Sequence, residues 1–343
     1  GGPNHDRLGF RYWKDGNAFH EYLTGGSTGQ FLSFWSAIIM AGFAFVTAPE
    51  VVVSCSAETT NPRKLLPKCA NQFVYRLTFF YLLGALVIGV IVSSRNEALD
   101  GDSSTVAASP FVLGIQNAGI PVLNHIINAV VLTLAASSGN SYLYAASRTL
   151  YSLALKGSTP KVFKQVNRFG VPYNCVLVSF VVGCLAYLNV SSSSEQVFVW
   201  LANITTISGF IAWIFVPFAY IRWRKAIAIQ GLEDRVPYKT ILQPYGAWYV
   251  LILNVIITIT NGYAVFFDFN ASSFVAAYIT LPIVVVLYVG HRAYSYFCLG
   301  RKRWLTPYEE FDFSKLDMVE FELTQLIEPE AKNRFGKVRN YFA

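Results

Sequence analysis

Charged residues are scarce in this sequence. Asp, Glu, Lys and Arg make up 14% of its 343 residues, whereas soluble domains carry about 25%. Hydrophobic residues reach 54%, and the mean hydropathy is +0.41. A soluble protein of this composition would lack the polar side chains needed to cover its surface, so the apolar residues must face lipid. The composition therefore predicts an integral membrane protein.

The residue groups that support catalysis or metal binding are missing as well. The four histidines are scattered, and none of the five cysteines has a metal-ligand spacing or an expected extracellular partner. The sequence contains no nucleophile–base constellation and no phosphate-binding loop. We therefore expect no enzymatic activity, cofactor, metal site or disulfide. The net charge of +7 is explained by basic cytoplasmic ends of a membrane protein and does not indicate nucleic-acid binding.

Seven long apolar runs are present. A helix needs about 20 apolar residues to cross the hydrocarbon core of a bilayer. The runs lie at 30–55, 72–94, 120–146, 172–190, 196–221, 246–267 and 273–298. We therefore predict an all-α, multi-pass transmembrane bundle over residues 30–298.

The positions of Lys and Arg predict the orientation of the bundle. If the chain starts outside, its inner loops are 57–71, 148–171 and 222–244, followed by the C-terminal segment from residue 292. These segments hold three, five, five and nine Lys or Arg residues, 22 of the 27 in the chain. Positive charge gathers on the cytoplasmic side of membrane proteins. Residues 1–29 are accordingly expected to be an extracellular loop segment, and residues 299–343 a cytoplasmic tail.

Glu50 is a rare carboxylate within an apolar run, and Pro49 precedes it directly. A charge within the membrane is costly and usually functional, and a proline inside a helix kinks or breaks it. The sequence thus predicts a break near residues 46–49, with freed backbone groups beside a carboxylate, as at ion or substrate sites. The alternative is a structural Glu50 that bonds to a neighbouring span beside a simple bend.

Two further spans carry small and hydroxyl residues. The third span ends in Ser-Ser-Gly-Asn-Ser at 137–141, and the fifth contains Asn-Ile-Thr-Thr-Ile-Ser-Gly at 203–209. Such residues let helices approach closely and hydrogen-bond across the contact. Both stretches fit a helix–helix interface or the wall of a ligand pocket, and the residues alone leave the two possibilities open.

Four separated stretches carry a family resemblance. The first is Ser-Ala-Glu-Thr-Thr-Asn-Pro-Arg-Lys-Leu-Leu-Pro at 56–67, directly after the Glu50 span. The second contains Ser-Gly-Asn-Ser at 138–141 and Ser-Arg-Thr-Leu-Tyr at 147–151. The third is Thr-Ile-Ser-Gly-Phe-Ile-Ala-Trp at 206–213, and the fourth is Pro-Tyr-Lys at 237–239 with Gln-Pro-Tyr-Gly-Ala-Trp-Tyr at 243–249. In this order they resemble the fungal, yeast-type amino-acid permeases of the amino acid–polyamine–organocation superfamily.

The resemblance implies a twelve-span transporter built from two inverted five-helix repeats and two further helices. On that plan the chain corresponds to spans six to twelve, which agrees with its Gly-Gly start, and we expect it to be an incomplete permease. The family pattern Phe-x-Gly-x-Glu reads Val-Thr-Ala-Pro-Glu at 46–50 here. Glu50 matches, Ala48 replaces the glycine, and Pro49 is expected to supply the break.

The resemblance implies transport of amino acids, coupled to protons, across the plasma membrane. The expected substrate-site residues are Phe45, Val46, Thr47, Ala48, Glu50, Ser138, Asn140, Thr206 and Ser208. The expected partners are an amino acid, the lipid bilayer and protons. Two alternatives stay open: a permease-like amino-acid sensor, and a seven-helix receptor, which lacks support because no Asp/Glu-Arg-Tyr run ends the third span.

Overall fold

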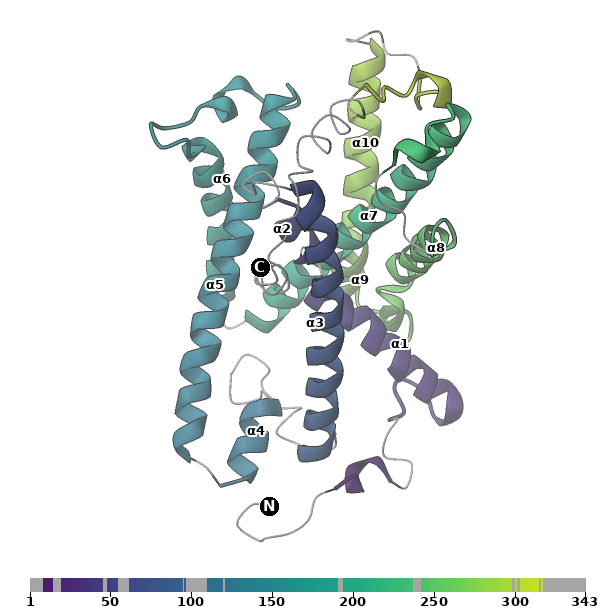
Figure 1. Ribbon diagram of the computed structural model, residues 1–343. Helices are drawn as coiled ribbons and strands as arrows, with labels where there is room; N and C mark the ends of the chain where they lie inside the picture. Colours follow the sequence, from purple (N-terminus) through teal and green to yellow (C-terminus); the bar gives the residue numbers. More distant parts are fainter. Residues whose placement is uncertain are drawn as a thin grey trace, which may run out of the picture. The chain divides into compact units, whose positions relative to one another are not determined.

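The secondary structure is helical. The computed structural model describes residues 9–14, 20–45, 48–54, 62–94, 96, 110–119, 121–190, 194–236, 242–297, 300, 303–314 and 316. Within these ranges no β-strand occurs, and the prediction of an all-α chain is confirmed. The α-helices, labelled in Figure 1, are α1 (Gly26–Phe45), α2 (Ala48–Ser54), α3 (Pro62–Ile91), α4 (Pro110–Asn117), α5 (Pro121–Leu155), α6 (Tyr173–Gly183), α7 (Ser194–Ile229), α8 (Tyr245–Thr260), α9 (Ala271–Tyr278) and α10 (Thr280–Phe297).

Helices occupy each of the seven apolar runs, but their lengths differ. Four are long and apolar enough to cross a membrane, namely Leu65–Ile91, His125–Leu155, Val197–Ile229 and Tyr245–Phe266. A fifth span is formed if α9 and α10, which are bent by 44°, count together. The run at 172–190 forms a shorter apolar helix, and the run at 30–55 is described as α1 and α2, on either side of residues 46–47. Among the described residues, the runs at 172–190 and 273–298 therefore differ from straight, full-length spans.

Several helices extend beyond the apolar runs that predict them. Helix α7 has 36 residues, a length of about 54 Å at the α-helical rise, although the hydrocarbon core is only ~30 Å thick. An apolar run marks the part of a helix inside lipid, whereas backbone hydrogen bonds continue the helix into polar sequence. The eight-residue helix α4 lies in a segment that the sequence assigns to a loop. It is stabilised by burial of Val112 and Leu113.

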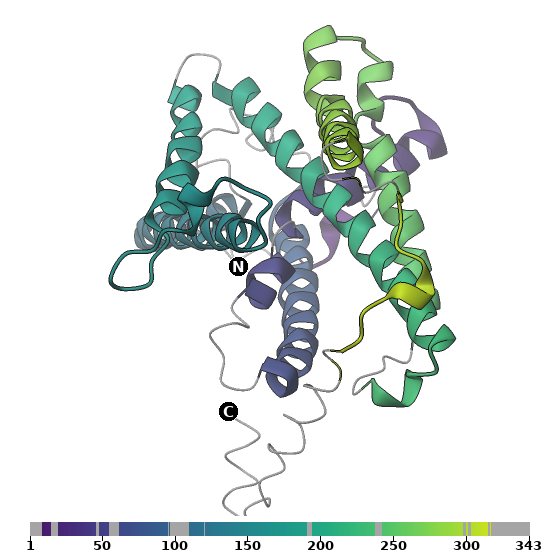
Figure 2. The same ribbon diagram turned by 90° about the horizontal axis from the view of Figure 1, so that it is seen from above.

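The chain divides into two compact units. Unit 1 comprises Gly1–Phe210 and Ile257–Ile283, and unit 2 comprises Ile211–Ile256 and Val284–Ala343. In unit 1, α5 packs against α2, α4 and α6, and α2 also packs against α3. Figures 1 and 2 both show α2 lying beside α3. The short helix that carries Glu50 is therefore held between two long helices.

In unit 2, part of the tail folds back onto α7. The side-chain amide of Gln230 donates to the backbone carbonyls of Tyr308, Glu309 and Phe311, at 3.0, 3.2 and 3.2 Å. Arg222 Nη2 donates to the carbonyl of Thr306 at 2.6 Å. The described tail residues 303–314 are thus anchored to the C-terminal half of α7.

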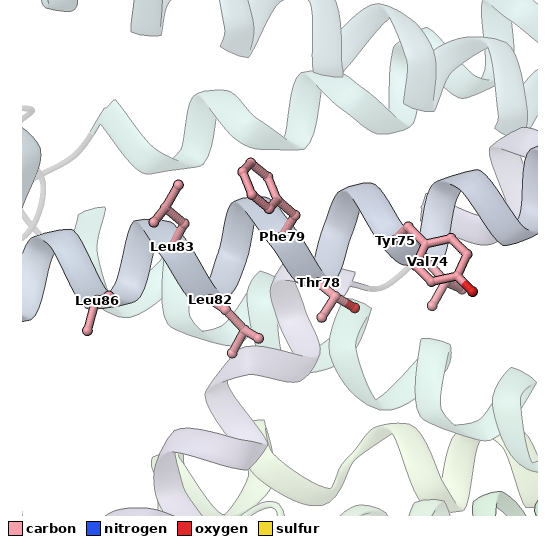
Figure 3. Close-up of a pocket in the computed structure, with 7 residues that line it drawn as sticks. All are labelled: Val74, Tyr75, Thr78, Phe79, Leu82, Leu83 and Leu86. Carbon is pink, nitrogen blue, oxygen red and sulfur yellow. The ribbon is translucent and has the colours of Figure 1, made fainter.

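The surface of α3 is apolar along much of its length. A shallow depression of about 570 Å³ is lined by Val74, Tyr75, Thr78, Phe79, Leu82, Leu83 and Leu86. Figure 3 shows these side chains standing out from several sides of the helix. The hydroxyl groups of Tyr75 and Thr78 are the only polar side-chain groups among these seven residues. The depression therefore suits lipid or an apolar helix better than a polar solute, as expected for a membrane span.

Candidate functional site

The first apolar run provides the candidate site. The structure describes it as α1, up to Phe45, and α2, from Ala48. Val46 and Thr47, two of the expected site residues, lie outside the described residues. Pro49 and Glu50 both lie in α2. The predicted break near residues 46–49 therefore stays a prediction, as does the alternative of a simple bend.

Glu50 lies within the first turn of α2 and is half-buried. Its Oε2 oxygen is inaccessible to solvent, and its backbone carbonyl accepts a hydrogen bond from Ser54 Oγ at 2.8 Å. Helix α2, which carries Glu50, packs against α3 and α5. A partly buried carboxylate inside an apolar run is a costly feature, which favours a functional role.

The end of α1 is positioned by two aromatic contacts within unit 1. The ring of Phe45 lies 4.7 Å, centroid to centroid, from that of Tyr81 on α3. Three residues before Phe45, Gly42 faces Phe210 of α7 so closely that a Cβ built on Gly42 would stand 2.1 Å from Phe210 Cζ. Both contacts hold the last described turn of α1 in place within unit 1.

The polar residues expected on α5 and α7 do not share one face. Residues two apart on a helix are about 200° apart around its axis. Thr206 is buried and donates to the carbonyl of Ala202 at 2.8 Å, whereas Ser208 is exposed and donates to Ile204 at 2.7 Å. Ser138 and Asn140 have the same spacing on α5, and both are exposed. At most one residue of each pair can therefore line a single pocket. On α7, Thr206 is a better candidate for a pocket wall than Ser208, because it is buried and lies one turn before Phe210.

A hydrogen-bond network that the sequence did not indicate holds the first half of α1. Tyr263 Oη lies 2.8 Å from the carbonyl of Leu32 and 2.6 Å from Ser36 Oγ. Because a carbonyl only accepts, the tyrosine donates to Leu32 and accepts from Ser36. Trp35 Nε1 donates to Thr260 Oγ1 at 3.0 Å. The one available signal was Asn-Gly at 261–262, which interrupts the sixth apolar run.

Replacing Tyr263 by Phe is expected to lower the free energy of unfolding by about 1–3 kcal/mol, because the Leu32 carbonyl and the Ser36 hydroxyl lose a partner. Thermal unfolding in detergent measures the effect, and hydrogen exchange should increase in α1. Tyr245→Phe is the matched control, since Tyr245 is 82% exposed. Equal stability of the two variants would contradict the assignment.

Comparison with known proteins identifies the family. The amino acid permease family model matches residues 1–299. A probable proline-specific permease of Schizosaccharomyces pombe is 54% identical over 301 residues, covering 86% of this chain and 54% of that protein. The proline-specific permease of Saccharomyces cerevisiae is 48% identical over 340 residues, covering 97% of this chain and 52% of that protein.

A dicarboxylic amino acid permease of Saccharomyces cerevisiae is 40% identical over 300 residues, covering 85% of this chain and 49% of that protein. The chain thus spans about half the length of the curated relatives it matches. No solved structure matches it. The resemblance found in the separated strings is confirmed, and the chain belongs to the amino acid permease family.

Proposed function

We propose that this chain forms the part of an amino-acid permease that contains an interrupted substrate-binding helix, and that the substrate is proline. The observation that carries the proposal is the family match over residues 1–299, and the sequence Ala-Pro-Glu at 48–50, where a helix break is expected, supports it. The choice of proline rests on identity. Two relatives named proline-specific are 54% and 48% identical, whereas the dicarboxylic permease is 40% identical.

The predicted break near residues 46–49 would suit an amino acid because it would free backbone groups. The last four carbonyls of an α-helix have no intrahelical partner, so a helix that ends at the break would offer them to a ligand. Carbonyl oxygens accept hydrogen bonds from an ammonium group, and proline, as a secondary amine, offers two such protons. Irregular backbone at membrane depth is tolerated where it lines a cavity. On this proposal the backbone around the break forms the wall of the site.

Proton coupling and location in the plasma membrane form the finer part of the proposal. Glu50 is the candidate proton carrier, because its carboxylate combines partial burial with a place beside the expected break. Carboxylates within membrane spans form the proton relays of pumps and transporters. The receptor alternative has lost its basis, since the chain belongs to a family of permeases.

A chimeric permease tests the proposal. The matched 301-residue segment of the Schizosaccharomyces pombe relative is replaced by the aligned residues of this chain and expressed in yeast cells that lack proline uptake. We expect saturable uptake of labelled proline, competed by unlabelled proline and unaffected by a tenfold excess of glutamate or lysine. A fluorescent tag checks that the chimera reaches the plasma membrane.

Delivery to the plasma membrane without proline uptake would contradict the proposal. If such cells still respond to external proline, the sensor alternative replaces transport. Uptake that glutamate or lysine abolishes would retain amino-acid transport and overturn the assignment of proline.

A further inference from the structure

A second concave site lies in unit 2, at the C-terminal end of α10. Its cavity, of about 730 Å³, is lined on one side by α10 residues that include Tyr288, Arg292 and Ser295. These residues recur at intervals of four and three and therefore share one helix face. Tail residues 303–307 and Glu310 supply the rest of the lining. The cavity therefore has one helical wall and one wall made by the folded tail.

The cavity is positively charged. Arg292 and Arg303 both line it, and the one carboxylate in the lining, that of Glu310, forms an ion pair with Arg303. The Arg292 guanidinium instead lies 5.3 Å from the centroid of the Trp304 ring. One arginine charge is thus balanced within the lining, while the other rests against an aromatic face.

Arg292 has donors directed at no protein acceptor. Its Nε and Nη2 atoms are inaccessible to solvent and have no hydrogen-bond partner in the part of the chain that the structure describes. An unmade hydrogen bond to a charged group costs about 1.5–3 kcal/mol or more. Nε and one Nη of a guanidinium form a planar fork that matches two oxygens of a phosphate. An anion that reaches this fork from the cavity would supply the missing acceptors.

The tail wall of the cavity is held in place from α7. Gln230 binds three tail carbonyls, and Arg222 binds the carbonyl of Thr306. The Arg222 guanidinium and the Lys225 ammonium also lie 4.8 and 5.0 Å from the centroid of the Tyr308 ring. Trp304 is therefore presented to Arg292 by a fixed segment.

We propose that this cavity binds the phosphate headgroup of an anionic phospholipid in the cytoplasmic leaflet. A lipid fits better than free phosphate for two reasons. Tyr288 and Trp304, whose ring centroids are 6.4 Å apart, add aromatic surface beside the charge, and tryptophan and tyrosine prefer the membrane interface. The site also lies where a membrane span ends, on the side that the distribution of Lys and Arg assigns to the cytoplasm.

Lipid binding to the purified chain in detergent tests the proposal. Native mass spectrometry follows titration with dioctanoyl phosphatidic acid, and dioctanoyl phosphatidylcholine serves as the neutral-headgroup comparison. Arg292→Gln is expected to weaken binding of phosphatidic acid by about tenfold or more, the effect of losing a hydrogen-bonded charge. Arg292→Lys keeps the charge without the fork and should give a smaller loss.

Arg168→Gln is the control. Arg168 is exposed and lies against Phe169 in unit 1. Its replacement by Gln removes the same unit of positive charge from the expected cytoplasmic side. Circular dichroism verifies that each variant keeps its helices. Equal weakening by Arg292→Gln and Arg168→Gln would overturn the site, since only general attraction to positive charge would remain. Displacement of the lipid by equimolar inorganic phosphate would overturn the lipid assignment in favour of a free-phosphate site.

Discussion

Replacing Glu50 by Gln in the chimeric permease is expected to reduce the maximal rate of proline uptake by at least about tenfold. The amide keeps the shape of the side chain but removes its charge, and interactions of a charged group are worth about 1.5–3 kcal/mol, or about 10- to 150-fold. Glu50 is half-buried, and its helix α2 packs against α3 and α5. Uptake of labelled proline, normalised to the amount of permease at the cell surface, measures the loss.

The two possible roles of Glu50 predict different residual activities. If Glu50 carries the coupled proton, Glu50→Gln should still exchange internal for external proline while failing to accumulate it. If Glu50 holds the interrupted segment in shape, exchange and accumulation should fail together. Glu233→Gln is the control, because Glu233 is exposed in the loop between α7 and α8. Unchanged uptake in the Glu50 variant would remove this residue from the site.

Adding one methyl group at Gly42 is expected to destabilise unit 1 by about 1–3 kcal/mol, the usual cost of overpacking. The new Cβ would stand 2.1 Å from Cζ of Phe210, whose side chain is only 2% exposed and cannot swing aside. A loss of stability would be informative, because Gly→Ala in a helix interior otherwise raises the free energy of unfolding by about 1 kcal/mol. Thermal unfolding in detergent measures the change.

Gly84→Ala provides the matched control, since nothing lies within 4 Å of a Cβ built there. This variant should be as stable as the original chain or more so. Phe210→Leu combined with Gly42→Ala should recover part of the loss, which gives a coupling free energy between α1 and α7. If Gly42→Ala and Gly84→Ala behave alike, α1 and α7 do not meet at this point.

Features encoded locally could be predicted from the sequence. Apolar length alone located Leu65–Ile91 and Val197–Ile229. The strings at 56–67 and 243–249 indicated the family, which the match over residues 1–299 confirms. The break expected from Pro49 and Glu50 stays a prediction, because residues 46–47 lie outside the described residues. In the confirmed cases a few neighbouring residues determine the outcome through apolar length or a characteristic string.

Features that depend on contacts distant in sequence could not be predicted. Nothing near Gly42 indicates that Phe210 will cover it, and nothing near Gln230 indicates that it will bind carbonyls about 80 residues later. Thr206 and Ser208 appear equivalent in a polar stretch, but the helix directs them to different sides. Orientation about a helix axis becomes known only when the neighbouring helix is known.

The contact between Gln230 and the tail also bears on how the chain is synthesised. Its two halves lie about 80 residues apart, so α7 has left the ribosome well before the tail carbonyls exist. Until then Gln230 and Arg222 must be satisfied by water or lipid headgroups. A chain that terminates before Thr306 would leave these side chains without their final acceptors. Unit 2 therefore completes these hydrogen bonds only after translation has passed Phe311.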